Sequence, residues 1–250
     1  MNSAHLTLSF VILALLSTLI AWYIPPLELI PPHFADEEVF LGLPRGKNVL
    51  SALMLSLVGL LGLLGRPRFG HGRDVLLSVM LCCLSMILAG GVNAWAHLEP
   101  SPLARSVAQG LLSVSLINAS FALVTSQLSV QGRWWLLGSA QLLALMSSLY
   151  HYDQQEHRFT LMLDLFAGEV LIFSLGRAWW SGLAQRSIIY LFLCLLLLIG
   201  GWLCIYYDQW VWRISSMILS GQTLAHLLWS GVGACWLRYF IFWRPHRVES

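Results

Sequence analysis

Charged side chains are scarce in this chain. Of its 250 residues, 10% are Asp, Glu, Lys or Arg and 58% are hydrophobic, and the mean hydropathy is +0.72. Soluble domains carry about 25% charged residues, so the composition excludes an ordinary water-soluble globular protein. The net charge of +2 supplies no basic excess for binding a nucleic acid. The composition therefore predicts a protein embedded in a membrane.

The chain also lacks a disulfide or thiolate pattern and a linker. None of its five cysteines lies in a CxxC spacing, and all of them lie in or at the end of apolar segments: Cys82, Cys83, Cys194, Cys204 and Cys235. Such cysteines are typical of small buried side chains, not of a zinc ribbon. No polar linker separates two parts of the chain and no internal repeat is evident. One polytopic membrane domain over residues 1–250 is expected.

Long hydrophobic runs are what the sequence has in abundance. A transmembrane helix needs about 20 mainly apolar residues, and eight segments come near this length: 6–24, 48–64, 75–96, 106–128, 134–150, 159–176, 187–206 and 214–237. No Lys or Arg precedes the first segment, and no small-x-small cleavage site follows it, so it is interpreted as a true helix and not as a signal peptide. The predicted fold is an all-α bundle of about eight transmembrane helices.

The basic residues predict how the bundle is oriented. With eight spans, both termini lie on one side of the membrane, and that side holds nine of the 14 basic residues. These are Arg66, Arg68, Arg73, Arg133, Arg177, Arg186, Arg238, Arg244 and Arg247, against Arg45, Lys47, Arg105, Arg158 and Arg213 on the other side. Because Lys and Arg concentrate in cytoplasmic loops, both termini are expected in the cytoplasm. The location expected is the bacterial inner membrane.

Polar side chains at membrane depth are costly and mark functional candidates. Gln222 and His226 are four residues apart, and so are Asn93 and His97. This spacing places each pair on one helix face. A lone histidine in a span can equally well form a hydrogen bond to a neighbouring helix, so both interpretations stay open here.

Three stretches together resemble a known family. They are an acidic stretch leading into a span (PHFADEEVFLGLPRGKNVLSALM), the end of the third span (LAGGVNAWAHLEP), and SGQTLAHLLWSGVGACWL, which follows YYDQWVWRISSMIL. In order and spacing they resemble the bacterial branch of the alkaline ceramidases, in the superfamily of membrane hydrolases that includes the adiponectin receptors. The resemblance implies a seven-helix core over 34–237, preceded by an extra helix and loop over 1–33 and followed by a basic cytoplasmic tail over 238–250.

The resemblance also implies a site. The family hydrolyses the amide bond of ceramide-like lipids with a zinc ion held by three histidines, assisted by a serine and an aspartate. In this chain His97 and His226 match the first and last histidines. The middle histidine is replaced by Gln222, a weaker zinc ligand, and the serine by Asn93. The aspartate position holds Ala108, or Gln109 if the loop is one residue longer.

These substitutions leave two functions open. The chain is predicted to be a metal-dependent hydrolase of a lipid amide, with metal ligands His97, His226 and Gln222, and with Asn93 and Gln109 at the catalytic positions. Alternatively, it is a non-catalytic membrane protein that keeps the fold and has a lipid-binding, regulatory or assembly role. Zinc is the expected cofactor, in a weakened site. Calcium, which acidic residues bind in eukaryotic relatives, is not expected although Asp36, Glu37, Glu38 and Asn48 fall in the corresponding region.

A transporter with a proton path is a third interpretation. Asp164 and Glu169 are the acids inside the sixth predicted span. They are five residues apart, which is roughly 140° around a helix. Since the two acids do not lie on one face of the helix, they do not line a single continuous proton path.

Overall fold

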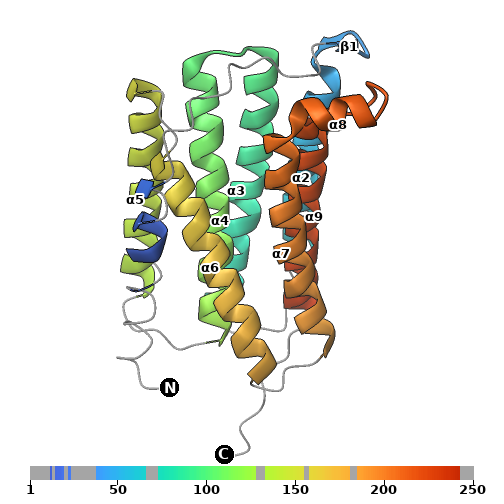
Figure 1. Cartoon of the computed structure of the whole chain (residues 1–250). Helices are drawn as coiled ribbons and strands as arrows, with labels where there is room; N and C mark the ends of the chain where they lie inside the picture. The colour runs from blue at the N-terminus through green and yellow to red at the C-terminus, as the bar shows by residue number, and fades with distance from the viewer. Residues whose placement is uncertain are drawn as a thin grey trace, which may run out of the picture.

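A bundle of long helices dominates the structure, a computed structural model (Figure 1). It describes residues 12, 15–19, 22–23, 38–65, 73–127, 133–154, 158–180 and 185–242. The long helices are α2 (Gly46–Leu64), α3 (Arg73–Leu98), α4 (Pro102–Gln127), α5 (Arg133–Gln154), α6 (Arg158–Trp180), α7 (Gln185–Tyr206) and α9 (Gly221–Phe242). A short helix α8 (Asp208–Ile214) and a hairpin of β1 (Val39–Phe40) with β2 (Leu43–Pro44) complete the described elements. The all-α prediction is confirmed apart from this hairpin.

Five of the described helices are long and apolar enough to cross a membrane. They span Gly46–Leu64, Arg73–Leu98, Pro102–Gln127, Phe159–Trp180 and Ser187–Tyr206, and each matches a segment predicted from the sequence. Helices α5 and α9 have 22 residues each and are not among these five. The chain is an integral membrane protein, and the count of eight spans stays a prediction.

The eighth predicted span, 214–237, is wrong at its start. The helix α8 ends at Ile214, and α9 begins only at Gly221 and continues to Phe242. Between them the backbone turns through Ser216 and Met217, whose φ angles of 55° and 64° lie in the left-handed region that a helix of L-residues avoids. The hydroxyl of Ser220 then accepts a hydrogen bond from the N–H of Thr223 at 3.0 Å, which makes Ser220 the N-cap of α9.

The first predicted span, 6–24, lies largely outside the described residues. Residues 12, 15–19 and 22–23 are helical, and they reach α6. The hydroxyl of Ser17 donates a hydrogen bond of 2.8 Å to Glu169 Oε2, and Ser17 is fully buried. Glu169 is therefore bonded to the N-terminal segment.

Small residues let α2 and α3 pack closely. A Cβ atom on Gly59 would lie 2.5 Å from the carbonyl oxygen of Cys83, and one on Gly90 would lie 2.6 Å from the backbone nitrogen of Ser56. Such contacts are not possible, so the two backbones approach each other only because both positions are glycine. This packing is typical of helices inside a membrane.

The main core lies where α3, α4, α7 and α9 meet. Tyr239 and Phe240 on α9 are fully buried and pack with Cys82, Leu123 and Leu191. Helix α5 packs on α4 and α6 at the side of this core. The hairpin and α8 lie at the end of the bundle where α2, α4 and α9 begin and α3 ends (Figure 1), and that end holds the polar site.

Candidate functional site

Two histidines from distant parts of the chain meet at this end of the bundle. His97 lies in the last turn of α3, and His226 lies in the second turn of α9. Their ring centroids are 5.2 Å apart, with an angle of 69° between the ring planes. His97 is 3% exposed and His226 is 5% exposed. The structure thus brings together the two histidines that the sequence singled out.

Ser51 determines which nitrogen of His226 carries a hydrogen. Its hydroxyl donates a 3.0 Å hydrogen bond to the carbonyl of Asn48, one turn earlier on α2. The same oxygen lies 3.1 Å from His226 Nδ1. A hydroxyl has one hydrogen, so Ser51 donates it either to the Asn48 carbonyl or to His226 Nδ1. When Ser51 donates to the carbonyl, His226 donates Nδ1–H to Ser51 and the Nε2 atom of the neutral ring keeps its lone pair.

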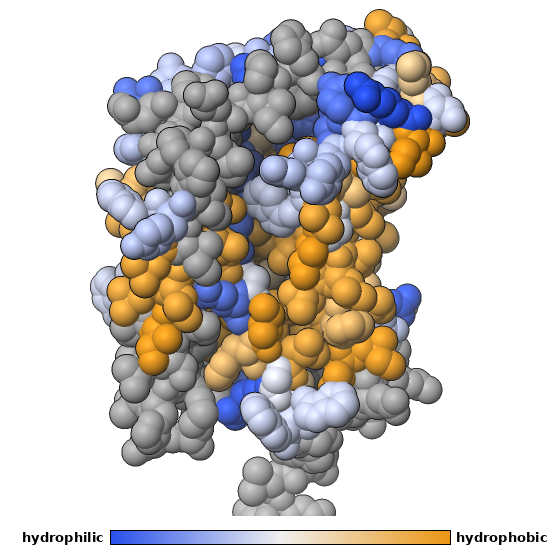
Figure 2. All heavy atoms as spheres, viewed as in Figure 1, coloured by the Kyte–Doolittle hydropathy of each residue, from blue (hydrophilic) through white to orange (hydrophobic). Residues whose placement is uncertain are grey.

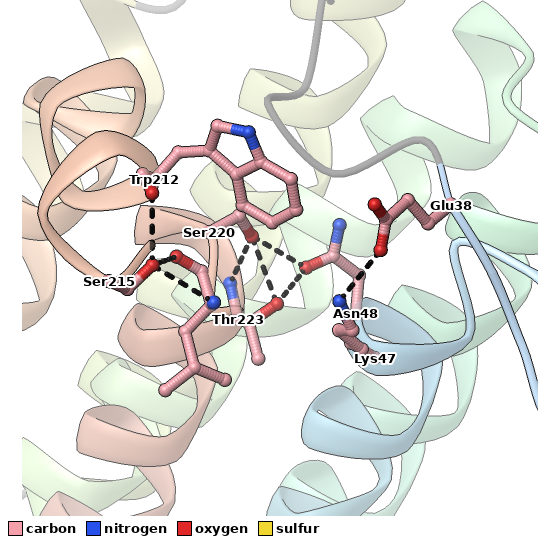
Figure 3. Close-up of polar contacts among 8 residues, drawn as sticks. Glu38, Lys47, Asn48, Trp212, Ser215, Ser220 and Thr223 are labelled. Atoms are coloured by element: carbon pink, nitrogen blue, oxygen red, sulfur yellow. Dashed lines mark hydrogen bonds and ion pairs between the residues drawn. The ribbon is translucent and has the colours of Figure 1, made fainter. Parts of the chain in front are cut away.

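A second polar cluster ties α2 to the start of α9 (Figure 3). Asn48 is fully buried, and its Oδ1 accepts hydrogen bonds from the hydroxyls of Ser220, at 3.1 Å, and Thr223. The Nδ2 atom of Asn48 is buried without a hydrogen-bond partner among the described residues. Sequence reasoning missed Ser220 and Thr223, although Ser-x-x-Thr before an apolar run is a recognisable N-cap pattern.

Gln222 lies one turn before His226 on the same face of α9. Its backbone N–H donates a 2.9 Å hydrogen bond to Asp208 Oδ1, which holds the first turn of α9 against α8. The side-chain oxygen Oε1 of Gln222 is buried and has no hydrogen-bond partner among the described residues. A buried acceptor of this kind is costly, and it is available to a ligand.

Asn93 and Ala108 are two further residues that the sequence singled out. Asn93 is partly buried one turn before His97 on α3 and makes no side-chain hydrogen bond to another described residue. Ala108 on α4 is 4% exposed and packs with Val92 and Ala96 of α3. Its neighbour Gln109 points elsewhere and lines an internal cavity.

The cavity lies inside the bundle and is mostly apolar. It is lined by residues of α2, α3, α4, α6, α7 and α9. Trp229 belongs to its wall, and the Trp229 ring is centred 6.3 Å from the ring of His226. One residue of the cavity wall thus lies close to His226. Figure 2 shows the apolar surface hollowed between α6 and α7.

The two membrane acids have separate partners. Asp164 is 6% exposed, lines the cavity, and accepts a 3.0 Å hydrogen bond from Ser113 of α4. Glu169 instead accepts from Ser17. The two acids are thus hydrogen-bonded to different segments, Asp164 to α4 and Glu169 to the N-terminal residues.

The acidic stretch before α2 contributes one ion pair to the described structure. Glu38 lies 3.0 Å from the ammonium group of Lys47, and Lys47 lies 5.3 Å from the ring centroid of Trp212. Asp36 and Glu37 lie outside the described residues. Asn48, which the sequence placed in the same region, uses its side-chain oxygen to bind Ser220 and Thr223.

The residues at the histidine pair fit a divalent metal in part. Two imidazoles that bind one tetrahedral zinc through nitrogens at 2.0–2.1 Å have centroids about 5 Å apart, and the observed separation is 5.2 Å. With Nδ1–H donated to Ser51, His226 Nε2 carries a lone pair, and the Gln222 oxygen, which has no hydrogen-bond partner among the described residues, is a third donor on the same helix. Within the described residues, no group of three or more His, Cys, Asp or Glu side chains is gathered for a metal. Any ion here would thus depend on Gln222 or water.

Fold and site together define an integral membrane protein of helices with a buried histidine pair above an apolar cavity. No protein family model matches the chain, and no curated protein or solved structure matches it.

Proposed function

We propose that the chain is a divergent ceramidase-like membrane hydrolase whose site holds one divalent metal ion. The observation that carries the proposal is the contact between His97 and His226, with ring centroids 5.2 Å apart. These residues are 129 positions apart in the sequence, and only the resemblance singled them out as members of one site. The substrate class is a membrane lipid with an amide bond, and the ion is zinc.

The ligand set consists of His97, His226 and Gln222. A metal-ligating histidine usually donates its other ring N–H to a fixed acceptor, which orients the ring. Ser51 is such an acceptor for His226. The bound ion would supply a polarised water for attack on an amide carbonyl. Asn93, one turn before His97, is the side chain available as a hydrogen-bond donor to the developing oxyanion.

The proposal includes an orientation in the membrane. The histidines lie at the end of the bundle where α9 begins, so a cytoplasmic C-terminus puts the site in the outer half of the membrane. The excess of arginine on the side of both termini supports this orientation, and the bacterial inner membrane is the location proposed.

A non-catalytic lipid-binding or assembly protein is the second candidate. Hydrolases of this kind need a group that moves a proton to or from the bound water, and no carboxylate stands at position 108 or 109. The hydrogen bonds from Ser220 and Thr223 to Asn48 also connect α9 to α2 at this end of the bundle. A buried cluster of this kind stabilises a bundle without any chemistry.

Metal content of the purified full-length protein tests the proposal. Elemental mass spectrometry of the wild type is compared with H97A and H226A prepared identically. About one zinc per chain, lost in both variants, supports a metal site, and hydrolysis of a ceramide is then assayed. Well-folded protein that takes up no metal after incubation with zinc contradicts the hydrolase and favours the second candidate.

A further inference from the structure

The helix α8 lies across one end of the bundle, whereas the long helices run along it (Figure 1). It begins two residues after Tyr206, where the membrane-crossing part of α7 ends. Lys47 lies in the first turn of α2, which also crosses the membrane, and 5.3 Å from the ring centroid of Trp212 in α8. Because two membrane-crossing helices have an end at the level of α8, this short helix lies at the boundary between hydrocarbon and water.

One face of α8 holds it to the bundle. Asp208 and Trp212 are four residues apart and share this face, and both are partly buried. Asp208 Oδ1 accepts the 2.9 Å hydrogen bond from the backbone N–H of Gln222. The ring of Trp212 makes a cation–π contact with the ammonium group of Lys47. The helix α8 is therefore attached to both α9 and α2.

A group of large apolar side chains is exposed on α8 and in the turn after it. Trp210 and Ile214, again four residues apart, lie about 200° around the helix from the face that packs on the bundle. They are 63% and 62% exposed, and Met217 and Ile218 in the turn are 61% and 63% exposed. Large apolar side chains gathered in this way typically mark a surface that contacts a membrane or another protein.

A polar edge makes α8 amphipathic. Gln209 and Arg213 are exposed, and they lie about 100° and 140° around the helix from Asp208, between the packed face and the apolar face. Aromatic and aliphatic residues on one side, with a basic residue on another, are typical of a helix that lies in the plane of the membrane surface. Tryptophan is also enriched at this boundary.

We propose that residues 208–218 form an interfacial anchor, whose apolar side chains insert among the acyl chains of the leaflet at this end of the bundle. Lipid is favoured over a protein partner because the apolar face of α8 continues a surface that lipid covers. In the last turn of α7, Leu203 and Tyr206 are 52% and 61% exposed, and α7 contains one of the five membrane-crossing segments. The inference is independent of the proposed hydrolase, since it involves neither the histidine pair nor a metal.

Photocrosslinking to lipid compares the apolar face of α8 with its polar edge. Full-length protein with p-benzoylphenylalanine in place of Trp210, Ile214, Gln209 or Arg213, one position at a time, is reconstituted into phosphatidylcholine vesicles and illuminated. Phospholipase C then removes the headgroups, and mass spectrometry counts the protein chains that retain diacylglycerol. All four side chains are exposed, so the substitutions are expected to leave the packing of the bundle unchanged.

The apolar face should give the higher yield of lipid adduct. Trp210 and Ile214 are expected to retain several-fold more diacylglycerol than Gln209 and Arg213. Their yield should approach that of the same label at Leu196, which is 50% exposed in the middle of α7. Equal yields at all four positions of α8 would overturn the anchor, and so would a low yield at Trp210 and Ile214 beside a high yield at Leu196. Crosslinks from Trp210 to a second copy of the chain in place of lipid would also overturn it, because they would assign the apolar face to a protein interface.

Discussion

Ser51 of α2 and His226 of α9 lie 3.1 Å apart, oxygen to Nδ1, and this contact sets the chemistry of the histidine pair. When the hydroxyl of Ser51 donates to the carbonyl of Asn48, the ring of His226 donates Nδ1–H to Ser51. In that arrangement a serine on the neighbouring helix leaves Nε2 of a buried histidine as an acceptor or metal ligand.

Replacing Ser51 with alanine should weaken metal binding without removing a ligand. His226 would lose the acceptor that orients its ring and fixes its tautomer, and loss of such an outer partner typically costs about 10–100-fold in metal affinity. Zinc titration of purified S51A with a competing chelator measures the effect.

Ser56 supplies the matched control for that titration. It lies on the same helix, and its hydroxyl donates to the carbonyl of Ile87 at 2.7 Å, away from the histidines. S56A should therefore keep the wild-type zinc affinity. If S51A and S56A bind zinc equally well, the hydrogen bond to His226 has no role in a metal site.

Gln222→His should raise zinc occupancy. The substitution adds an imidazole one turn from His226, and three histidines are the ligand set of many catalytic zinc sites. The zinc that each chain retains during dialysis against a competing chelator is expected to be higher in Q222H than in the wild type. Adding H97A to Q222H should bring the metal content down again, because His97 is a ligand in either variant.

Restored hydrolysis should require a carboxylate as well. Q222H combined with Q109D supplies the third histidine and the aspartate that this chain lacks at the matched positions. Q222H combined with A108D instead places the carboxylate on the side of α4 that packs against α3. Ceramide hydrolysis by either double variant is measured against Q222H alone. A double variant that gains neither metal nor activity would speak against the assignment of these positions to one site.

The membrane helices were predictable because length and apolarity alone decide them. Span 187–206 matches the apolar helix Ser187–Tyr206, and α4 begins at Pro102, only four residues before the predicted start. The break before α9 was missed because residues 214–220 are also apolar, and hydropathy does not register the cap at Ser220 or the left-handed turn at Ser216. The hairpin was missed because its strands have two residues each.

The site was predictable only in part. The resemblance singled out His97 and His226, but the role of Ser51 depends on how α2 packs against α9, which no local pattern records. Gln109 was grouped with the histidines, whereas the structure turns it into the cavity beside Asp164. Packing decides which face of α4 contacts α3 and which face lines the cavity. Ala108 lies on the first face and Gln109 on the second.

Asn48→Ala should destabilise the bundle. The variant removes the acceptor of two buried hydroxyls, those of Ser220 and Thr223, and removal of one partner from a buried hydrogen bond costs about 1–3 kcal/mol. Unfolding of the purified protein in increasing dodecyl sulfate, followed by circular dichroism, measures the free energy. N93A is the matched control, because Asn93 makes no side-chain hydrogen bond among the described residues. An equal loss of unfolding free energy in N48A and N93A would mean that the hydrogen bonds to Asn48 do not stabilise the bundle.

Neighbouring glycines on α3 allow a test of the close approach between α2 and α3. A Cβ atom on Gly90 would lie 2.6 Å from the backbone nitrogen of Ser56 and 2.8 Å from the carbonyl oxygen of Ala52, whereas one on Gly91 would meet nothing within 4 Å. G90A should therefore force the helices apart and lose about 1–3 kcal/mol of stability, the usual cost of overpacking.

G91A should have no such cost. Alanine is favoured over glycine inside a helix by about 1 kcal/mol, so G91A is expected to be neutral or slightly more stable in the same dodecyl sulfate assay. Because the two substitutions add the same methyl group to the same helix, the difference between them isolates contact with α2. Equal stabilities of G90A and G91A would mean that α2 and α3 do not pack through Gly90.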